Sequence, residues 1–273
     1  MKNIFRPMFI AFVAIAALSL TGCRKEGCTD ENASNFNPDA KKDDGSCLYE
    51  GSTVALKFDH RWGNTFGPFS MNEDFTHPGT QNHINFTTLN YYISNVKLKN
   101  ADGTWWKENE SYHLVKVTEN TVPQIVLEGV PLGKYTEISY MIGVDSTRNV
   151  SGAQTGALSP SNGMFWSWTT GYIFIKAEGH SNDAPMDFFA YHIGGFSKEV
   201  GGDAIRINNQ TFNGEELNVR KGGGASIHFL VNAARFWHGG IQISNTPSIH
   251  MPGTMAETMA TNFSEGFIID HLH

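Results

Sequence analysis

The run Leu89-Asn90-Tyr91-Tyr92-Ile93-Ser94-Asn95-Val96-Lys97-Leu98-Lys99, followed by Ala101-Asp102-Gly103 and then Trp105-Trp106, indicates the fold more clearly than any other stretch. Aromatic and β-branched residues dominate the run, and these residues favour strands. Asp-Gly between two such runs is a strong hairpin signal. We therefore predict two antiparallel strands that are joined by a turn at residues 101–103.

Similar short runs recur along the chain and are separated by Gly, Pro and Asn turns. They occupy residues 54–60, 84–86, 112–117, 123–127, 138–145, 171–174, 188–193, 205–207, 226–232 and 240–243. The only predicted helix covers residues 255–260, with Thr254 as its N-cap. Many short alternating runs with almost no helical period predict an all-β fold, an antiparallel sandwich or barrel. We favour an antiparallel β-sandwich with one main domain at residues 51–273.

The N-terminus has the pattern of a secretory signal. Lys2 and Arg6 precede an apolar run at residues 7–18, and Leu20-Thr21-Gly22-Cys23 follows. The last four residues resemble a bacterial lipobox, whose cysteine becomes the lipidated first residue of the mature protein. We therefore expect residues 1–22 to be removed and Cys23 to anchor the protein to a membrane of the bacterial cell envelope, as an outer-membrane lipoprotein on its periplasmic or surface face. The alternative is an ordinary signal peptide with a free cysteine nearby.

Residues 23–50 form a segment of different composition. With Cys23 assigned to the lipid, Cys28 and Cys47 remain, and an even pair in an exported chain predicts a disulfide. Closing a loop of this length stabilises the folded state by about 3 kcal/mol. Residues 27–47 resemble the short Cys-flanked repeats of surface and secreted proteins in Bacteroidota-like bacteria, which have the pattern GCTDPxAxNYNPxAxxDDGSC.

Acidic side chains in this segment could bind calcium. The candidate carboxylates are Asp30, Asp39, Asp43 and Asp44. Their oxygens are hard ligands of the kind that Ca²⁺ prefers. The alternative is a solvated acidic spacer between the lipid and the main domain.

Composition and motifs exclude several classes of function. The net charge of -7 argues against a nucleic-acid partner, since phosphate binding requires a basic surface. The chain has no Gly-x-Ser-x-Gly, no His-Glu-x-x-His and no phosphate-binding glycine loop. We therefore expect a protein that is not an enzyme.

Histidine is abundant, with eleven residues, and imidazole in the absence of thiolates suits copper, zinc or nickel. His60 and His192 each end a strand on the side that we expect to be apolar, so they could converge at one rim of the sandwich. His271 and His273 share one face of an extended C-terminal segment and form a third candidate.

A series of motifs extends over most of the chain. They are Leu89 to Leu98, Asp102-Gly103, Tyr112-His113-Leu114-Val115, Pro131-x-Gly133-x-Tyr135, Gly143-Val144-Asp145, Arg148-Asn149-Val150, Met164-Phe165-Trp166-Ser167-Trp168-x-x-Gly171-Tyr172, Glu178-Gly179 and Tyr191-His192-Ile193-Gly194. In their order and spacing, residues 54–273 resemble the MbnP-like family of bacterial envelope copper-binding proteins.

This resemblance implies a β-sandwich that binds copper, as Cu(I) or Cu(II). In relatives, two histidines are joined by a tryptophan that has been oxidised to kynurenine, whose aryl amine is a ligand. A di-haem peroxidase-like partner of the MauG type performs the oxidation. An unmodified indole nitrogen is only a donor and cannot ligate. Carried over, the resemblance implies that His60 and His192 are ligands and that the tryptophan is Trp62, Trp166 or Trp168.

Two other functions fit the sequence. A surface carbohydrate- or ligand-binding sandwich would use exposed tryptophans to stack on sugar rings. The tryptophans available for this are Trp62, Trp105, Trp106 and Trp166. The third possibility is a structural module of the envelope that has no ligand of its own.

Overall fold

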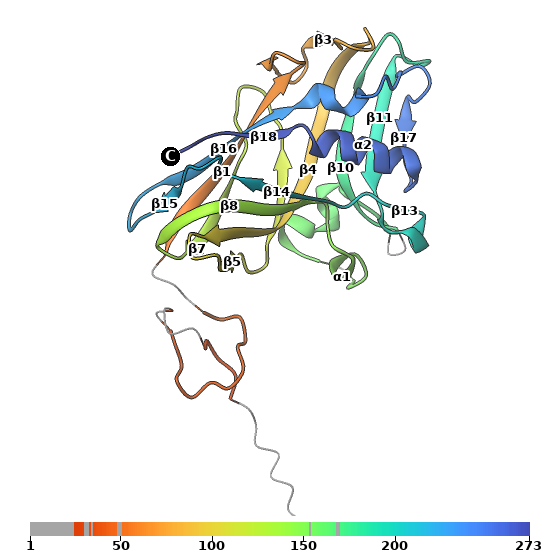
Figure 1. Ribbon diagram of the computed structural model, residues 1–273. Coiled ribbons are helices and arrows are strands. Elements are labelled where there is room, and N and C mark those ends of the chain that lie inside the picture. The colour runs from red at the N-terminus through yellow and green to blue at the C-terminus, as the bar shows by residue number, and fades with distance from the viewer. Residues whose placement is uncertain (1–24, 30–32, 34, 48–50, 153, 168–169) are drawn as a thin grey trace, which may run out of the picture. The chain divides into compact units, whose positions relative to one another are not determined.

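The structure, a computed structural model, describes residues 25–29, 33, 35–47, 51–152, 154–167 and 170–273 (Figure 1). The chain divides into two compact units, Met1–Cys47 and Leu48–His273. The predicted signal peptide and Cys23 lie outside the described residues, so lipidation stays a prediction. No helix formed by the described residues has the length and apolar character needed to cross a membrane.

The first unit is held by its disulfide. Cys28 and Cys47 are joined with an S–S distance of 2.09 Å, which confirms the predicted bond. Glu26 and Lys42 form an isolated bridge, and their side chains make an ion pair of 2.6 Å. Few apolar side chains are available in this segment, so the covalent bond replaces a hydrophobic core.

The second unit is a sandwich of two sheets. The smaller sheet has the order β18 (Phe267–Leu272), β16 (Ala225–Asn232), β1 (Ser52–Trp62) and β2 (Gly67–Pro68), and β7 (Gln124–Val130) also pairs with β1. The larger sheet has the order β14 (Arg206–Thr211), β8 (Gly133–Ile142), β4 (His83–Asn100), β10 (Gly171–His180), β11 (Phe188–Gly194) and β17 (Ser248–Ile249).

Shorter strands extend the larger sheet. They are β3 (Asp74–Thr76), β5 (Trp105–Lys107) and β6 (Tyr112–Lys116) on β4, β15 (Leu217–Val219) on β8, and β9 (Phe165–Ser167) on β10. A separate ribbon pairs β12 (Phe196–Ser197) with β13 (Gly202–Asp203). The predicted hairpin is confirmed, because β4 ends at Asn100 and Lys99 pairs with Trp105.

The core lies between the sheets and is rich in aromatic rings. Every second residue of β1, from Ser52 to Trp62, is buried, as the period of a strand requires. Phe58 of β1 stacks on Phe229 of β16 at 5.3 Å and meets the edge of Tyr91, on β4 of the other sheet, at 6.1 Å.

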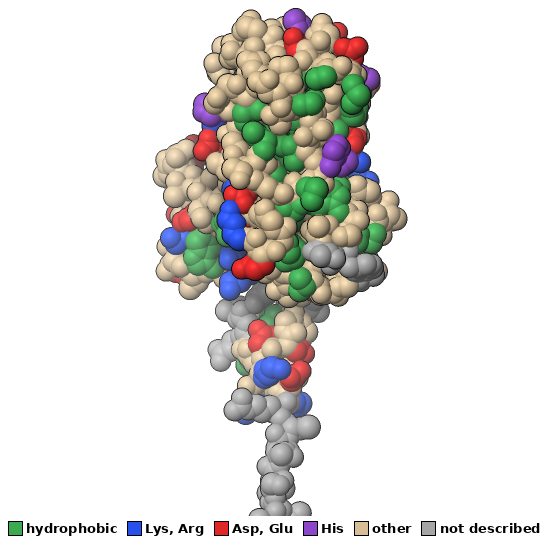
Figure 2. Space-filling model, turned by 90° about the vertical axis from the view of Figure 1, so that its right-hand side faces the viewer, with side chains coloured by type: hydrophobic (Ala, Val, Ile, Leu, Met, Phe, Trp, Pro, Cys, Tyr) green, Lys and Arg blue, Asp and Glu red, His purple; other side chains and the backbone are tan. Residues whose placement is uncertain are grey.

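Figure 2 shows one face of the molecule, on which acidic and basic side chains are interspersed.

Strand direction differs from the prediction at one important place. Most pairs are antiparallel, but β1 and β16 are parallel, with His60 opposite Val231. β11 and β17 are also parallel. The alternation of apolar residues is the same for both directions, so the sequence pattern could not distinguish them.

The helices also differ from the prediction. Helix α2 spans Thr254–Ser264, and Gly253 occupies its N-cap, so Thr254 lies inside the helix and is not the cap. A short helix, α1 (Ser146–Asn149), was not predicted, and the side chain of Asp145 caps it. The described residues also form short 3₁₀ helices, η1 (Gly156–Leu158), η2 (Pro160–Asn162), η3 (Lys198–Val200) and η4 (Ala233–Trp237).

Candidate metal centre

Three imidazoles meet in the smaller sheet, near the end of β18. His228 comes from β16, His271 comes from β18, and His273 follows β18. The His228 and His271 rings are stacked with centroids 4.1 Å apart, and His273 lies 5.0 Å and 4.8 Å from them. Among the described residues, this is the group whose potential ligand atoms all lie within 4.8 Å of one another.

Strand geometry explains this cluster. The period of two in an extended segment turns His271 and His273 to one face, as predicted. Antiparallel pairing then places His228 directly opposite His271. Reciprocal backbone hydrogen bonds between Ser226 and His273, of 3.0 Å and 2.9 Å, hold the C-terminal residue in register. The sequence did not single out His228, because its pairing with the C-terminus has no local signal.

Polar neighbours orient two of the rings. Ser226 Oγ lies 3.0 Å from His228 Nε2, and Asp270 Oδ2 lies 2.7 Å from His271 Nδ1. One nitrogen of each of these two imidazoles is therefore engaged by a polar neighbour. Metal-binding histidines commonly have such a partner on the second nitrogen.

Electrostatics favours the neutral form of His228. Its pKa lies below the ordinary value because burial disfavours the imidazolium, and the neighbouring His271, Lys57 and His273 act in the same direction. Asp270 opposes this effect. An imidazole must be neutral to bind a metal, so this environment suits a ligand.

The three imidazoles fit an ion of the size of copper if their nitrogens move slightly closer together. Metal–nitrogen bonds of about 2 Å require the ligating nitrogens to lie within about 4 Å of one another. In this cluster the potential ligand atoms lie within 4.8 Å of one another. His271 and His273 are exposed, so their rings can turn inward without disturbing the core. Three imidazoles without thiolates suit copper, zinc or nickel.

His60 lies elsewhere, buried in the core. Its side chain points inward from β1, and its Nε2 lies 3.3 Å from the Tyr91 hydroxyl. Its Nδ1 has no hydrogen-bond partner among the described residues. Burial lowers the pKa of this imidazole to about 3. The ring borders a cavity of about 200 Å³ that Phe69 and Met71 also line.

His192 lies on the opposite face of the larger sheet from the core. Its neighbours in β11, Tyr191 and Ile193, are fully buried, so the alternation turns His192 outward. There its Nε2 contacts Glu178 Oε1 at 2.7 Å, and the His250 ring lies 5.1 Å away. Burial lowers the pKa of His192 even though the Glu178 carboxylate opposes the shift.

The expected convergence of His60 and His192 is therefore wrong. His60 points into the core from the smaller sheet, and His192 points away from it. The face of β11 that looks towards the core was assigned wrongly. Ala190, on the same face as His192, is buried, and so is Tyr191 on the core face, so apolar residues occupy both faces of this strand.

The candidate tryptophans have packing roles where the structure describes them. Trp62 is buried, its ring lies 4.8 Å from Phe75, and its Nε1 donates to the Thr76 carbonyl at 3.1 Å. Trp166 is partly buried and lies against Gly194, where a Cβ would come within 2.9 Å of the indole ring. Trp168 lies outside the described residues.

The tryptophans considered for stacking on sugar rings differ in exposure. Trp62, Trp106 and Trp166 are buried or partly buried. Trp105 is exposed, and the ammonium of Lys99 lies 5.7 Å from its ring centroid.

The acidic residues of the first unit are engaged in local contacts. Asp39 pairs with Lys25 at 2.8 Å, Asp43 accepts from the Gly45 amide at 3.0 Å, and Asp44 accepts from the Ser46 amide at 2.9 Å. In the part of the chain that the structure describes, they do not form a metal-binding group with other potential ligands. Asp30 lies outside the described residues, so calcium binding stays a prediction.

Comparison with known proteins gives one family and two individual matches. A 24-residue stretch is 71% identical to ribulose bisphosphate carboxylase/oxygenase activase A of Hordeum vulgare, and covers 9% of this chain and 5% of that protein. The structure is similar to that of MbnP from Methylosinus trichosporium, with 13% identity and a TM-score of 0.44, over 65% of this chain and 75% of that chain. The sequence profile of the MbnP family matches residues 51–252, and the chain therefore belongs to the MbnP family.

Proposed function

We propose that this protein binds copper in the bacterial cell envelope and holds the ion with His228, His271 and His273. The observation that carries the proposal is the cluster of three imidazoles whose potential ligand atoms lie within 4.8 Å of one another. Membership of the MbnP family is compatible with an extracytoplasmic protein associated with copper. The single imidazoles of His60 and His192 provide no comparable group among the described residues.

The arrangement suits capture and handling of copper rather than turnover of a substrate. His271 and His273 are exposed at the end of the chain, so an ion bound there can be reached from solvent. The ion would supply a Lewis-acidic, redox-active centre, and the protein would supply three imidazoles, of which Ser226 orients that of His228 and Asp270 orients that of His271. The lipid on Cys23 would keep the site at the outer membrane.

Oxidation of a tryptophan to kynurenine, by a di-haem peroxidase-like partner of the MauG type, belongs to the same proposal. The candidates are Trp62, Trp166 and Trp168. Tandem mass spectrometry of protein from the native host would identify a modified residue. If all three tryptophans are unmodified, this part of the proposal fails and the imidazole site is unaffected.

Titration of the metal-free protein with Cu(II), and with Cu(I) against a chelator of known affinity, tests the site. We expect the wild-type protein to bind a single ion tightly. His228→Ala and the double variant His271→Ala/His273→Ala remove ligands. Their affinity should fall by more than the roughly 10–100-fold that follows loss of an outer-sphere partner.

His60→Ala and His192→Ala are the matched comparisons, because each removes one imidazole and leaves the cluster intact. Both should keep the wild-type affinity if they fold, which circular dichroism checks. The reverse pattern, in which His60→Ala loses copper and His228→Ala retains it, would move the site to the cavity beside His60 and refute the location proposed here.

A further inference from the structure

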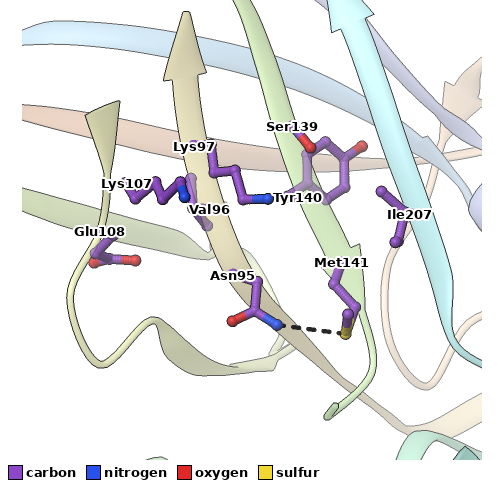
Figure 3. Close-up of a pocket in the computed structure, with 9 residues that line it drawn as sticks. All are labelled: Asn95, Val96, Lys97, Lys107, Glu108, Ser139, Tyr140, Met141 and Ile207. Carbon is purple, nitrogen blue, oxygen red and sulfur yellow. Dashed lines mark hydrogen bonds between the residues drawn. The ribbon is translucent and has the colours of Figure 1, made fainter. Parts of the chain in front are cut away.

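A pocket on the larger sheet is chemically distinct from the histidine cluster. It has a volume of about 240 Å³ and is lined by residues of β4, β8 and β14 together with the end of β5 (Figure 3). Lys97, Lys107, Ser139, Met141 and Ile207 are the lining residues on which the inference depends.

A β-bulge shapes this pocket. Ser94 pairs with Met141 and Lys97 pairs with Ser139, so two residues of β4 oppose the single residue Tyr140 of β8. One of the two, Asn95, has a positive φ of 52°, a conformation that asparagine tolerates better than most residues. Its amide donates to Asp145 Oδ2 at 3.2 Å. Bulges locally disrupt pairing and are over-represented beside functional sites.

Two ammonium groups face the pocket without a partner. Lys97 and Lys107 are direct cross-strand neighbours on β4 and β5. Figure 3 shows Lys107 extending towards β4 and Lys97 extending towards β8. Neither ammonium group has an ion pair or hydrogen bond with another described residue, and the Glu108 carboxylate beside them is bound to His113 at 2.8 Å. Like charges at opposed positions are destabilising, so an anion between them would relieve this cost.

Three other lysines on the same sheet form ion pairs. Lys99 pairs with Glu137, Lys134 with Glu216 and Lys176 with Glu178. The net charge of the chain is -7, so carboxylates are plentiful, yet none pairs with Lys97 or Lys107 in the part of the chain that the structure describes. The pocket lining holds two ammonium groups, Lys97 and Lys107, and one carboxylate, Glu108, on a protein that is acidic as a whole.

The pocket is also lined by one more hydrogen-bond donor and by two apolar side chains. The Ser139 hydroxyl has no hydrogen-bond partner among the described residues, although the residue is only 7% exposed. Met141 and Ile207 are cross-strand partners beside it, and Ile207 is 61% exposed although it is apolar. Charged donors at one end and apolar side chains at the other define an amphipathic site.

We infer that this pocket binds a small molecule with an anionic head group and a short apolar tail. The head group would contact Lys97, Lys107 and Ser139, and the tail would pack on Met141 and Ile207. The volume of about 240 Å³ is below the range of about 300–1,000 Å³ that is typical of drug-sized ligands, so the ligand must be small. This inference does not depend on copper binding.

Calorimetric titration of the full-length protein with hexyl phosphate and hexanoate tests the inference. Hexanol has the tail without the charge, and inorganic phosphate has the charge without the tail. We expect at least one of the two amphipathic anions to bind about tenfold or more tightly than either comparison compound. Affinity should fall as salt rises, because the attraction is electrostatic.

Variants assign the binding to this pocket. Lys97→Met and Lys107→Met should each weaken binding of the amphipathic anion about tenfold, and Ile207→Ser should weaken it without changing the response to inorganic phosphate. Lys116→Met is the matched control, because Lys116 is an exposed lysine on β6 that lies outside the pocket. Failure of both anions to bind at millimolar concentration would overturn the inference. Unchanged binding by the Lys97→Met/Lys107→Met double variant would overturn it as well.

Discussion

His60 is a titratable side chain that the core holds in its neutral form. Burial lowers its pKa in the folded protein from the ordinary value of 6.5 to about 3. Between these values the unfolded chain binds a proton that the folded protein does not. The free energy of unfolding therefore falls on acidification through this window, with a limiting slope of about 1.4 kcal/mol per pH unit.

A His60→Phe variant should remove this contribution. We expect the loss of stability between pH 6.5 and pH 4.5 to be shallower than in the wild-type protein, as measured by urea unfolding. The absolute stability of the variant is less informative, because Tyr91 loses its hydrogen-bond partner. His180→Gln changes an exposed imidazole and should keep the wild-type slope. Equal slopes for wild type and His60→Phe would contradict the assignment.

Gly194 allows two segments to approach closely. A Cβ at this position would lie 2.5 Å from the Tyr172 carbonyl oxygen and 2.9 Å from the Trp166 ring. Gly194→Ala should therefore lower the free energy of unfolding by about 1–3 kcal/mol, the usual cost of overpacking. The matched control is Gly224→Ala, where a Cβ meets nothing within 4 Å. Urea midpoints of the two variants measure the difference, and similar midpoints would argue against the close contact.

At the scale of elements, a bound metal would tie β18 to β16. His228 belongs to one strand, and His271 and His273 belong to the other or follow it. Copper at a hundredfold excess over its dissociation constant should stabilise the folded state by about 2.7 kcal/mol. We expect slower amide hydrogen exchange in β18, a higher melting temperature, and reversal of both effects by a chelator.

His228→Ala separates this effect from nonspecific stabilisation. The variant keeps both strands and the exposed histidines of the C-terminus, so copper should no longer protect β18. Protection that persists in the variant, or that appears in β11 near His192, would show that the ion is held elsewhere.

At the scale of the whole molecule, the main domain has a complete core of its own. The buried aromatic residues Phe58, Tyr91, Phe229 and Phe263 all lie within Leu48–His273, and the disulfide lies within Met1–Cys47. A chain of residues 51–273 should therefore fold with an unchanged melting temperature and bind copper like the full protein. Reduction of Cys28–Cys47 should not change that melting temperature either. Calorimetry checks both expectations, and a marked loss of stability would show that the units depend on each other.

Local chemistry made much of the fold predictable. The run from Leu89 to Lys99 and the Asp102-Gly103 turn predicted the β4–β5 hairpin, because strand period and turn preference are properties of neighbouring residues. The disulfide followed from cysteine count, and the shared face of His271 and His273 followed from the strand period. The order of motifs identified the family that the profile match then showed.

The tertiary structure alone decided the contents of the candidate site. It paired β1 with β16 in parallel, brought His228 to His271 and His273, and turned His60 and His192 in different directions. A strand carries its alternation within its own sequence, but its partner and direction depend on hydrogen bonds with segments far away in the chain. A shift of one residue in phase moves a side chain to the other face of its sheet, which is why His192 was misplaced.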